Sequence, residues 1–261
     1  MNNLEAYEGF ASVYDIFMDD VDYDMWFDYV KKIYIKEGLS PKLALDLGCG
    51  TGNMTRLLAK EGIEMIGIDI SEQMLSEATK KAKSEGLDIL YLLQDMREFE
   101  LYGTVDLIIS LCDSLNYITE SDELSEVFRL VNNYLDPGGL FIFDLNTEHK
   151  FKNILSDNTF SYTTEDAAYI WENCYDEEEK INEYYVNFFI KDNDTDKYTR
   201  FEEFHYEKSY SIDEIKTLLM EAGLEFVAVY DAFTFEKPKK DSSRIYFVAK
   251  EKGKSELTED K

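Results

Sequence analysis

Residues 43–145 consist of short apolar runs that alternate with segments whose apolar residues recur at helical spacing. The apolar runs predict strands at 43–47, 64–69, 88–93, 105–111 and 140–145, and the spacing predicts helices such as 54–60 and 122–134. Five strands separated by helices indicate an α/β fold with a doubly wound parallel sheet. Ligands of such sheets bind beyond the carboxyl ends of the strands.

The pattern changes over residues 147–210, where aromatic-rich alternating segments at 169–175, 181–190 and 198–210 predict an inserted antiparallel β meander. The earlier pattern then resumes with a helix at 211–223 and strands at 225–231 and 243–249. We therefore expect one domain made of residues 1–146 and 211–250, an inserted subdomain at 147–210, and a charged tail at 251–261. Helical spacing over residues 4–36 predicts two further helices as an N-terminal cap.

Three alternating glycines, Gly48, Gly50 and Gly52, follow the first predicted strand. Glycines at this spacing allow a sharp turn and a close approach of a ligand to the backbone, and the next helix offers unpaired N–H groups. The loop lacks the third glycine of a dinucleotide fingerprint, because Asn53 or Thr55 stands there, and no Gly-Lys-Ser/Thr follows.

Aspartates stand at or near the ends of all five predicted strands. Asp69 ends the second strand, where nucleotide-binding units present a carboxylate to ribose hydroxyls. Some of these aspartates would be expected as helix caps or turn residues, but five at one sheet edge predict a polar pocket. They are Asp46, Asp69, Asp95, Asp113 and Asp144.

Charge and composition narrow the classes of partner. The 261 residues carry a net charge of −28, which disfavours nucleic acid as a substrate. Three scattered cysteines and two distant histidines predict neither a disulfide framework nor a metal site. No apolar run is long enough to span a bilayer, and the N-terminus lacks the features of a secretory signal, so we expect a cytoplasmic protein.

Four motifs in order resemble the class I S-adenosylmethionine-dependent methyltransferase family. They are the glycine loop Asp46-Leu47-Gly48-Cys49-Gly50-Thr51-Gly52, the acid Asp69, the turn Gln94-Asp95-Met96 and the turn Asp136-Pro137-Gly138-Gly139-Leu140. The resemblance implies a Rossmann-like methyltransferase sheet, mostly parallel with an antiparallel last strand, and S-adenosyl-L-methionine as cofactor. It covers roughly residues 40–146.

The resemblance also implies a set of cofactor contacts. Backbone around the glycine loop would contact the methionine part, Asp69 would accept from the ribose hydroxyls, and Asp46 would either meet the ammonium or only fasten the loop. Ile70 and Met96 would enclose the adenine, and Asp95 would accept from its amino group. The expected cofactor-binding residues are Tyr14, Asp46, Gly48, Cys49, Gly50, Asp69, Ile70, Met74, Asp95, Met96 and Cys112.

The aromatic N-terminal run, the segment 113–117 and the meander are similar to small-molecule methyltransferases, including N-methyltransferases of amino sugars. This narrower resemblance implies that Tyr14 covers the methionine end and that the meander covers the acceptor site. A base cannot be carried over, because some related enzymes have histidine where Tyr117 stands. The candidates for proton removal or acceptor orientation are Asp113, Asn116, Tyr117, His149 and His205, with Trp171 and Tyr184 as cleft or core residues.

The sequence thus predicts a methyltransferase that acts on a nitrogen or oxygen of a small molecule, as a monomer or homodimer. An RNA or protein methyltransferase remains an alternative if the few basic residues gather on one surface. A non-catalytic protein that binds S-adenosylmethionine is another, because the motifs indicate binding more directly than turnover.

Overall fold

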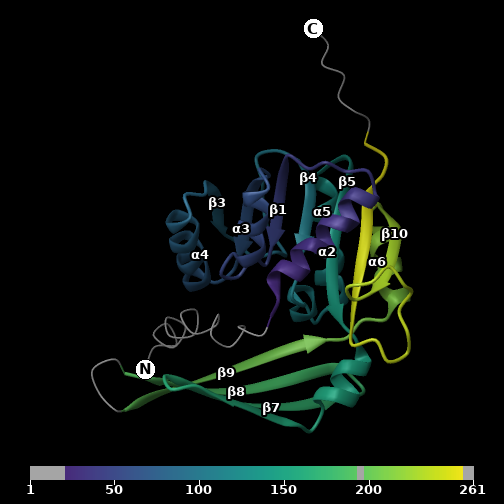
Figure 1. Cartoon of the computed structure of the whole chain (residues 1–261). Coiled ribbons are helices and arrows are strands. Elements are labelled where there is room, and N and C mark those ends of the chain that lie inside the picture. Colours follow the sequence, from purple (N-terminus) through teal and green to yellow (C-terminus); the bar gives the residue numbers. More distant parts are fainter. Residues whose placement is uncertain (1–20, 193–196, 255–261) are drawn as a thin grey trace.

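A seven-stranded sheet forms the centre of the computed structural model, which describes residues 21–192 and 197–254 (Figure 1). Its strand order is β10-β11-β5-β4-β1-β2-β3. The strands are β1 (Leu43–Leu47), β2 (Glu64–Asp69), β3 (Ile89–Leu93), β4 (Val105–Ser110), β5 (Leu135–Asn146), β10 (Leu224–Asp231) and β11 (Arg244–Glu251). β11 runs antiparallel to β5 and β10, and the other neighbouring strands are parallel. The predicted doubly wound sheet with an antiparallel last strand is confirmed.

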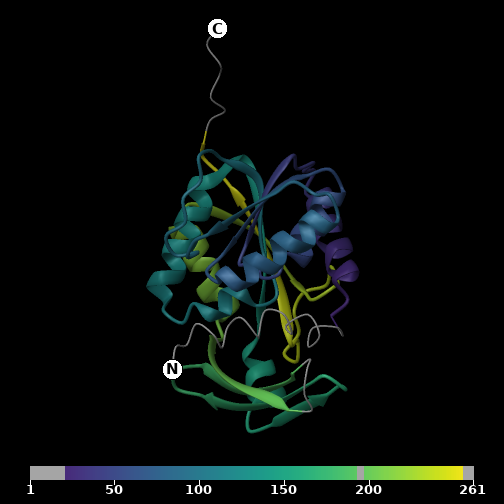
Figure 2. The same ribbon diagram turned by 90° about the vertical axis from the view of Figure 1, so that its left-hand side faces the viewer.

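Helices cover both faces of this sheet (Figure 2). The helices are α2 (Tyr23–Lys36), α3 (Asn53–Lys60), α4 (Glu72–Ser84), α5 (Ser121–Tyr134) and α6 (Ile212–Glu221). Side chains of α2 and α3 share one core with alternate strand residues such as Ala44, whereas those of α5 and α6 share the other core with residues such as Leu45. Both faces of the strands are therefore buried, which explains why they are continuous apolar runs.

A second sheet of four antiparallel strands follows β5, in the order β6-β7-β8-β9. Its strands are β6 (Thr159–Thr163), β7 (Ala167–Asp176), β8 (Ile181–Lys191) and β9 (Tyr198–Lys208). The sequence predicted the last three but missed β6, a mostly exposed edge strand without an apolar run. It also missed the π-helical segment η2 (Lys150–Leu155), whose Phe151 packs into the core of this meander. The predicted domain boundaries stay a prediction.

Two asparagines join the meander to the carboxyl ends of the central strands. Asn116 lies in the short helix η1 (Ser114–Tyr117) after β4, and its side chain donates to the carbonyls of Asn146 at 3.2 Å and Lys208 at 2.8 Å. The Asn146 N–H donates back to Asn116 Oδ1 at 2.9 Å. These bonds hold the end of β9 against the end of β5, so the meander lies beyond the carboxyl edge of the sheet (Figure 1).

Local signals set most helix ends. Ser71 caps α4, because its hydroxyl accepts from the Met74 N–H at 3.3 Å, and Ser211 forms a capping box with Glu214 at the start of α6. The turn predicted at 136–139 instead forms the irregular start of β5.

The first predicted N-terminal helix lies outside the described residues. Within the described part of the chain, every helix is too short or too polar to cross a membrane.

Tyr91 fills the space beneath the glycine loop, and this packing explains two glycines. A Cβ at Gly52 would lie 2.5 Å from Tyr91 Oη, and one at Gly67 would lie 2.7 Å from the Tyr91 ring and 2.9 Å from Cys49 Sγ. Such distances are well below van der Waals contact. The glycine loop therefore packs directly against the Tyr91 side chain of β3.

We expect Gly67→Ala to lower the free energy of unfolding by about 1–3 kcal/mol, because the added methyl group overpacks Tyr91 and Cys49. Urea denaturation of both proteins measures the difference. Gly103→Ala is the matched control, since a Cβ there meets no heavy atom within 4 Å. Equal urea midpoints for the wild type and Gly67→Ala would contradict this account of the packing.

Candidate active site

The glycine loop needs glycine at each of its three positions. Gly48, Gly50 and Gly52 have φ angles of +79°, +53° and +73°, a region that other residues rarely adopt. The N–H groups of Gly48 and Cys49 both donate to the Ile68 carbonyl, at 2.8 and 2.9 Å. This bifurcated contact ties the loop to the end of β2, so the loop and Asp69 are held side by side.

Asp69 connects the glycine loop to α4. Its Oδ2 accepts from the Gly50 N–H at 2.8 Å, and its Oδ1 accepts from the Ser71 N–H at 2.9 Å. Burial raises the pKa of this carboxyl, and the backbone donors oppose that rise. Each oxygen keeps a lone pair for a ligand, since a carboxylate oxygen accepts two hydrogen bonds.

Asp46 lies in β1 under the same loop and is 3% exposed. Its Oδ2 accepts from Thr55 Oγ1 at 2.5 Å, so it fastens the loop to α3. Its pKa is raised to about 7 as the net result of three effects. Burial is the largest and raises the pKa, the Thr55 hydrogen bonds lower it, and the Asp69 charge raises it. Two neighbouring carboxyl groups that are costly to ionise together favour a positively charged ligand.

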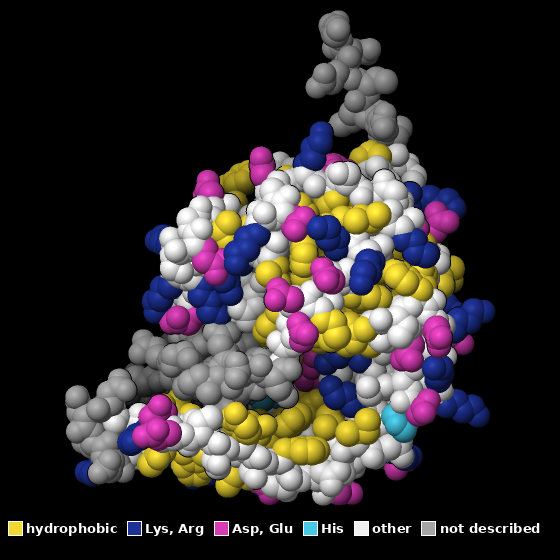
Figure 3. Space-filling view, in the orientation of Figure 1, with side chains coloured by type: hydrophobic (Ala, Val, Ile, Leu, Met, Phe, Trp, Pro, Cys, Tyr) yellow, Lys and Arg dark blue, Asp and Glu magenta, His cyan; other side chains and the backbone are white. Residues whose placement is uncertain are grey.

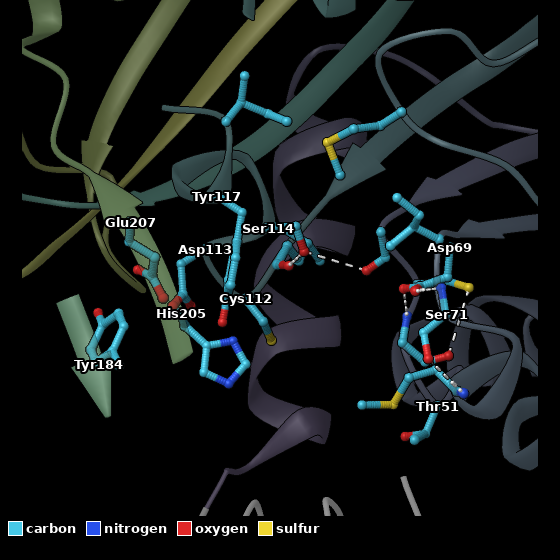
Figure 4. A pocket seen from close by; sticks show the side chains of 18 of the residues that line it. Thr51, Asp69, Ser71, Cys112, Asp113, Ser114, Tyr117, Tyr184, His205 and Glu207 are labelled. Atoms are coloured by element: carbon cyan, nitrogen blue, oxygen red, sulfur yellow. Dashed lines mark hydrogen bonds between the residues drawn. The ribbon is translucent and has the colours of Figure 1, made fainter. Parts of the chain in front are cut away.

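A cavity of about 860 Å³ opens between the glycine loop and the meander. Figure 4 shows Thr51, Asp69 and Ser71 at one end and Tyr117, Tyr184, His205 and Glu207 at the other. The predicted site residues that line it are Asp46, Gly48, Cys49, Gly50, Asp69, Ile70, Met74, Asp95, Met96, Cys112, Asp113 and Tyr117. Tyr14 lies outside the described residues.

His149 differs from expectation, because it is not among the residues that line the cavity. The next residue, Lys150, lines it instead. The Lys150 N–H donates to Thr147 Oγ1 at 3.2 Å where the chain enters η2, and Lys150 Nζ donates to Asn146 Oδ1 at 2.9 Å. Burial lowers the pKa of Lys150, although Asp113 and Glu207 oppose this effect.

Apolar surface borders the rim beyond Asp69. The Ile70 side chain is 68% exposed at the cavity, and Met96 lines the same space. Asp95 forms an ion pair with Arg97 at 2.6 Å, which lowers the Asp95 pKa and keeps this carboxyl ionised. An exposed isoleucine beside an ionised carboxylate can bind a flat, polar-edged ring.

The turn after β4 is strained. Cys112 and Asp113 have φ angles of +57° and +58° although neither is glycine, and such conformations persist where the surrounding structure holds them. Asp113 accepts from Arg244 Nη2 and from Asn146 Nδ2, each at 2.8 Å. Burial is the largest influence and raises the Asp113 pKa, but the Arg244 and Lys150 charges and the hydrogen bonds from Arg244 and Asn146 together outweigh it, so the net shift is downward. Arg244 also pairs with Asp144 and lies over the Trp26 ring at 5.0 Å.

The end of the cavity under the meander contains Glu207, a residue that no motif in the sequence marks as functional. Glu207 is 3% exposed, and its Oε2 accepts from Asn146 Nδ2 at 3.2 Å. Burial raises its pKa well above the ordinary range, and the Asp113 charge adds to this. The same strand places Glu203 and His205 on the cavity wall, joined by a contact of 2.9 Å. The available signal was the two-residue spacing of polar side chains in β9.

The fold and site define a Rossmann-like α/β protein with a nucleoside-type pocket at the carboxyl edge of its sheet. Residues 44–139 match the model of a methyltransferase domain family. A relative from Geobacillus sp. (strain WCH70), provisionally named a methyltransferase, is 37% identical over 94% of this chain and 99% of its own. The chain belongs to the class I S-adenosylmethionine-dependent methyltransferase family.

Solved structures agree with this assignment. An S-adenosylmethionine-dependent methyltransferase from Clostridium acetobutylicum is 35% identical, with a TM-score of 0.86 over 95% of this chain and 99% of that one. An amino pentose methyltransferase from Micromonospora echinaspora, solved with the cofactor bound, shares the fold at 18% identity, with a TM-score of 0.72 over 92% of this chain and 97% of that one. The protein is thus an enzyme whose methyl donor is S-adenosylmethionine.

The residues of the cavity fit this cofactor. A Cβ at Gly50 would meet no heavy atom within 4 Å, so open space lies in front of the loop. S-adenosylmethionine carries a sulfonium and an ammonium against one carboxylate, and the nearby Asp46 and Asp69 carboxyl groups complement that net positive charge. The individual contacts of each residue with the cofactor stay predictions.

We expect S-adenosylmethionine binding to release a proton from Asp46. The ligand-free carboxyl titrates near pH 7, and the cationic ligand favours its ionised form. Below pH 7 binding therefore costs a deprotonation, and the affinity rises with pH by up to about tenfold per unit until Asp46 is ionised. Calorimetry in buffers of different ionisation enthalpy measures about one proton released at pH 6 and little at pH 8.

Asp46→Asn should abolish this proton release, whereas the exposed control Asp88→Asn should retain it. An equal proton count for the wild type and Asp46→Asn at pH 6 would exclude Asp46 as the source.

Proposed function

We propose that the protein transfers the methyl group of S-adenosylmethionine to a nitrogen or oxygen atom of a small-molecule acceptor. The observation that carries this proposal is one cavity of about 860 Å³ shared by the glycine loop and the inner face of the meander. That volume is within the range of small-molecule sites. An acceptor bound in this cavity would have the glycine loop on one side and the meander covering it on the other.

Charge and surface features support a small acceptor over RNA. On the face shown in Figure 3, Lys and Arg side chains lie interspersed with Asp and Glu, and apolar side chains gather along the hollow above the meander. A polyanion needs a concentrated basic surface, particularly on a chain of net charge −28. The shared fold with an amino pentose methyltransferase also favours a small acceptor.

Bound S-adenosylmethionine supplies an activated methyl group together with its own leaving group. The protein's task is then to align the acceptor, exclude water and remove a proton where the acceptor has one to lose. Cys112 and Ser114 lie between the two ends of the cavity, where an acceptor would meet the donor (Figure 4). Ser114 Oγ donates to the Leu111 carbonyl at 2.7 Å, which fixes this side chain as part of the wall.

Among the candidate catalytic residues, Asp113 is better suited to positioning than to proton removal. Its carboxylate is engaged by Arg244 and Asn146, and its pKa is lowered, so it is a weak base. Tyr117 is 46% exposed at the cavity and meets the His205 ring edge-on at 5.8 Å. Its hydroxyl and ring are placed to orient an acceptor.

The test of this function uses isotopically methyl-labelled S-adenosylmethionine with three fractions of a cell extract: metabolites, RNA and protein. We expect the label in the metabolite fraction only. Label in RNA or protein would overturn the choice of acceptor class. Binding of the cofactor without label in any fraction would favour a non-catalytic role.

Asp69→Asn should weaken S-adenosylmethionine binding about 10–100-fold, because the neutral amide cannot provide the charged hydrogen bonds expected with the ribose. The amide also donates where the carboxylate accepts from Gly50 and Ser71, which loosens the loop. Calorimetric titration measures the affinity, with Asp88→Asn as control. An affinity within threefold of the wild type would remove Asp69 from the cofactor site.

A further inference from the structure

We propose that Glu207 binds the ammonium group of the acceptor, so that the small molecule methylated by this protein is an amine. This inference rests on the proposed function and specifies its acceptor. It assigns the anionic end of the acceptor site to a residue of the meander.

The position of Glu207 is fixed by groups from three separate segments. Asn146, at the end of β5, donates to its carboxylate at 3.2 Å, and the Tyr117 and Tyr184 side chains lie close enough for Glu207 to raise the pKa of each hydroxyl. Figure 4 shows Glu207, Tyr184 and Tyr117 around the same end of the cavity. The Asn146 bond and the two neighbouring rings restrict the orientation of this buried carboxylate, as a binding group requires.

Asp113 and Asp144 each have a cationic partner, whereas Glu207 has none in the part of the chain that the structure describes. Asp113 and Asp144 share Arg244, and Glu203 contacts His205. Lys150 Nζ donates a hydrogen bond to the Asn146 side chain, and its positive charge lowers the pKa of Glu207 without a salt bridge between them. Among residues 21–192 and 197–254, no Lys, Arg or His forms a salt bridge with Glu207. A buried carboxylate without a cation is costly, and a ligand cation would remove that cost.

The walls around this end are aromatic. Trp171 and Tyr184 lie with ring centroids 5.4 Å apart, and Tyr169 and Phe188 line the same cavity from β7 and β8. Aromatic faces attract organic cations and also cover their carbon skeletons. The Glu207 carboxylate beside such walls suits an ammonium carried on a compact, largely apolar body.

Glu207 also accounts for the proton that an amine acceptor must lose. The bound ammonium passes one proton to the carboxylate, and the freed nitrogen lone pair can then attack. The nitrogen gains the methyl carbon while the carbon–sulfur bond breaks and its electron pair stays on sulfur. The methylated nitrogen carries the positive charge, and Glu207 later returns the proton to water.

The charge state of Glu207 depends on all the groups that face it. These are Asp113 after β4, Asn146 in β5, Tyr117 in η1, Lys150 in η2 and Tyr184 in β8, with Glu203 and His205 on the same cavity wall from its own strand. Arg244 and Asp144 act indirectly, through their effects on Asp113 and Lys150. Ligand-free Glu207 has a raised pKa, because it is buried and lies near Asp113. A bound ammonium stabilises the carboxylate, so binding should release a proton.

The test uses cyclohexylammonium and benzylammonium chloride, with cyclohexanol and benzyl alcohol as neutral counterparts. Each probe is titrated by NMR into protein saturated with S-adenosylhomocysteine. We expect each ammonium to bind at least about tenfold more tightly than its alcohol, and Glu207→Gln to remove this preference. The control Glu202→Gln should retain it, because Glu202 is exposed on the opposite face of β9 beside Tyr185.

Three outcomes would overturn the inference: equal binding of ammonium and alcohol, a preference that Glu207→Gln retains, or no binding of either ammonium ion. The S-adenosylhomocysteine affinity of each variant is measured first. If the wild type did not bind S-adenosylhomocysteine, the proposed function itself would fail. If Glu207→Gln binds it as tightly as the wild type, the variant is folded, and any change in ammonium binding then arises at the acceptor end of the cavity.

Discussion

The side-chain amide of Asn146 connects the two sheets between which the cavity lies. Its Nδ2 donates to Asp113 at 2.8 Å and to Glu207 at 3.2 Å, and its Oδ1 accepts from Lys150 at 2.9 Å. The Asn116 side chain satisfies both backbone groups of Asn146. Each of these buried groups would cost about 1–3 kcal/mol if left without a partner, so the junction favours one arrangement of the meander over the sheet.

Carboxylates at the same sheet edge differ in behaviour because their surroundings differ. Asp46 is buried beneath a hydroxyl donor and titrates near neutrality, whereas Asp113 stays ionised beside Arg244. Asp113 and Arg244 are 131 residues apart in sequence. The sequence therefore predicted an acidic pocket but could not assign a charge state to each acid, since that depends on which distant cation and how much water each carboxyl meets.

The donor end was predictable because it is built from adjacent segments. The glycine spacing, the apolar run of β1 and Asp69 after β2 each report a local backbone requirement, and the structure gathers them at one cavity. The acceptor end was predictable only in part. The resemblance pointed to the meander and to residues such as Tyr117 and His205, which line the cavity, but Glu207 and Lys150 were missed because this end is assembled from η1, η2, β7, β8 and β9. The sequence also did not reveal which side chains of β9 face the cavity. Phe204 and Tyr206 are exposed, whereas Glu203 and Glu207 are buried, so the usual alternation of apolar side chains inward and polar side chains outward is inverted.

This division has a physical consequence for specificity. The glycine loop is braced by Tyr91, Ile68 and Asp69, all within the central sheet, and none of these contacts involves the meander. Substitutions on the inner faces of β7, β8 and β9 can therefore change the charge and shape of the acceptor end without disturbing the loop. A substitution of Asn146 would affect both parts, because its amide group donates to Asp113 beside the central sheet and to Glu207 on the meander. Acceptor choice can vary along the meander strands, but the alignment of acceptor and donor depends on that junction.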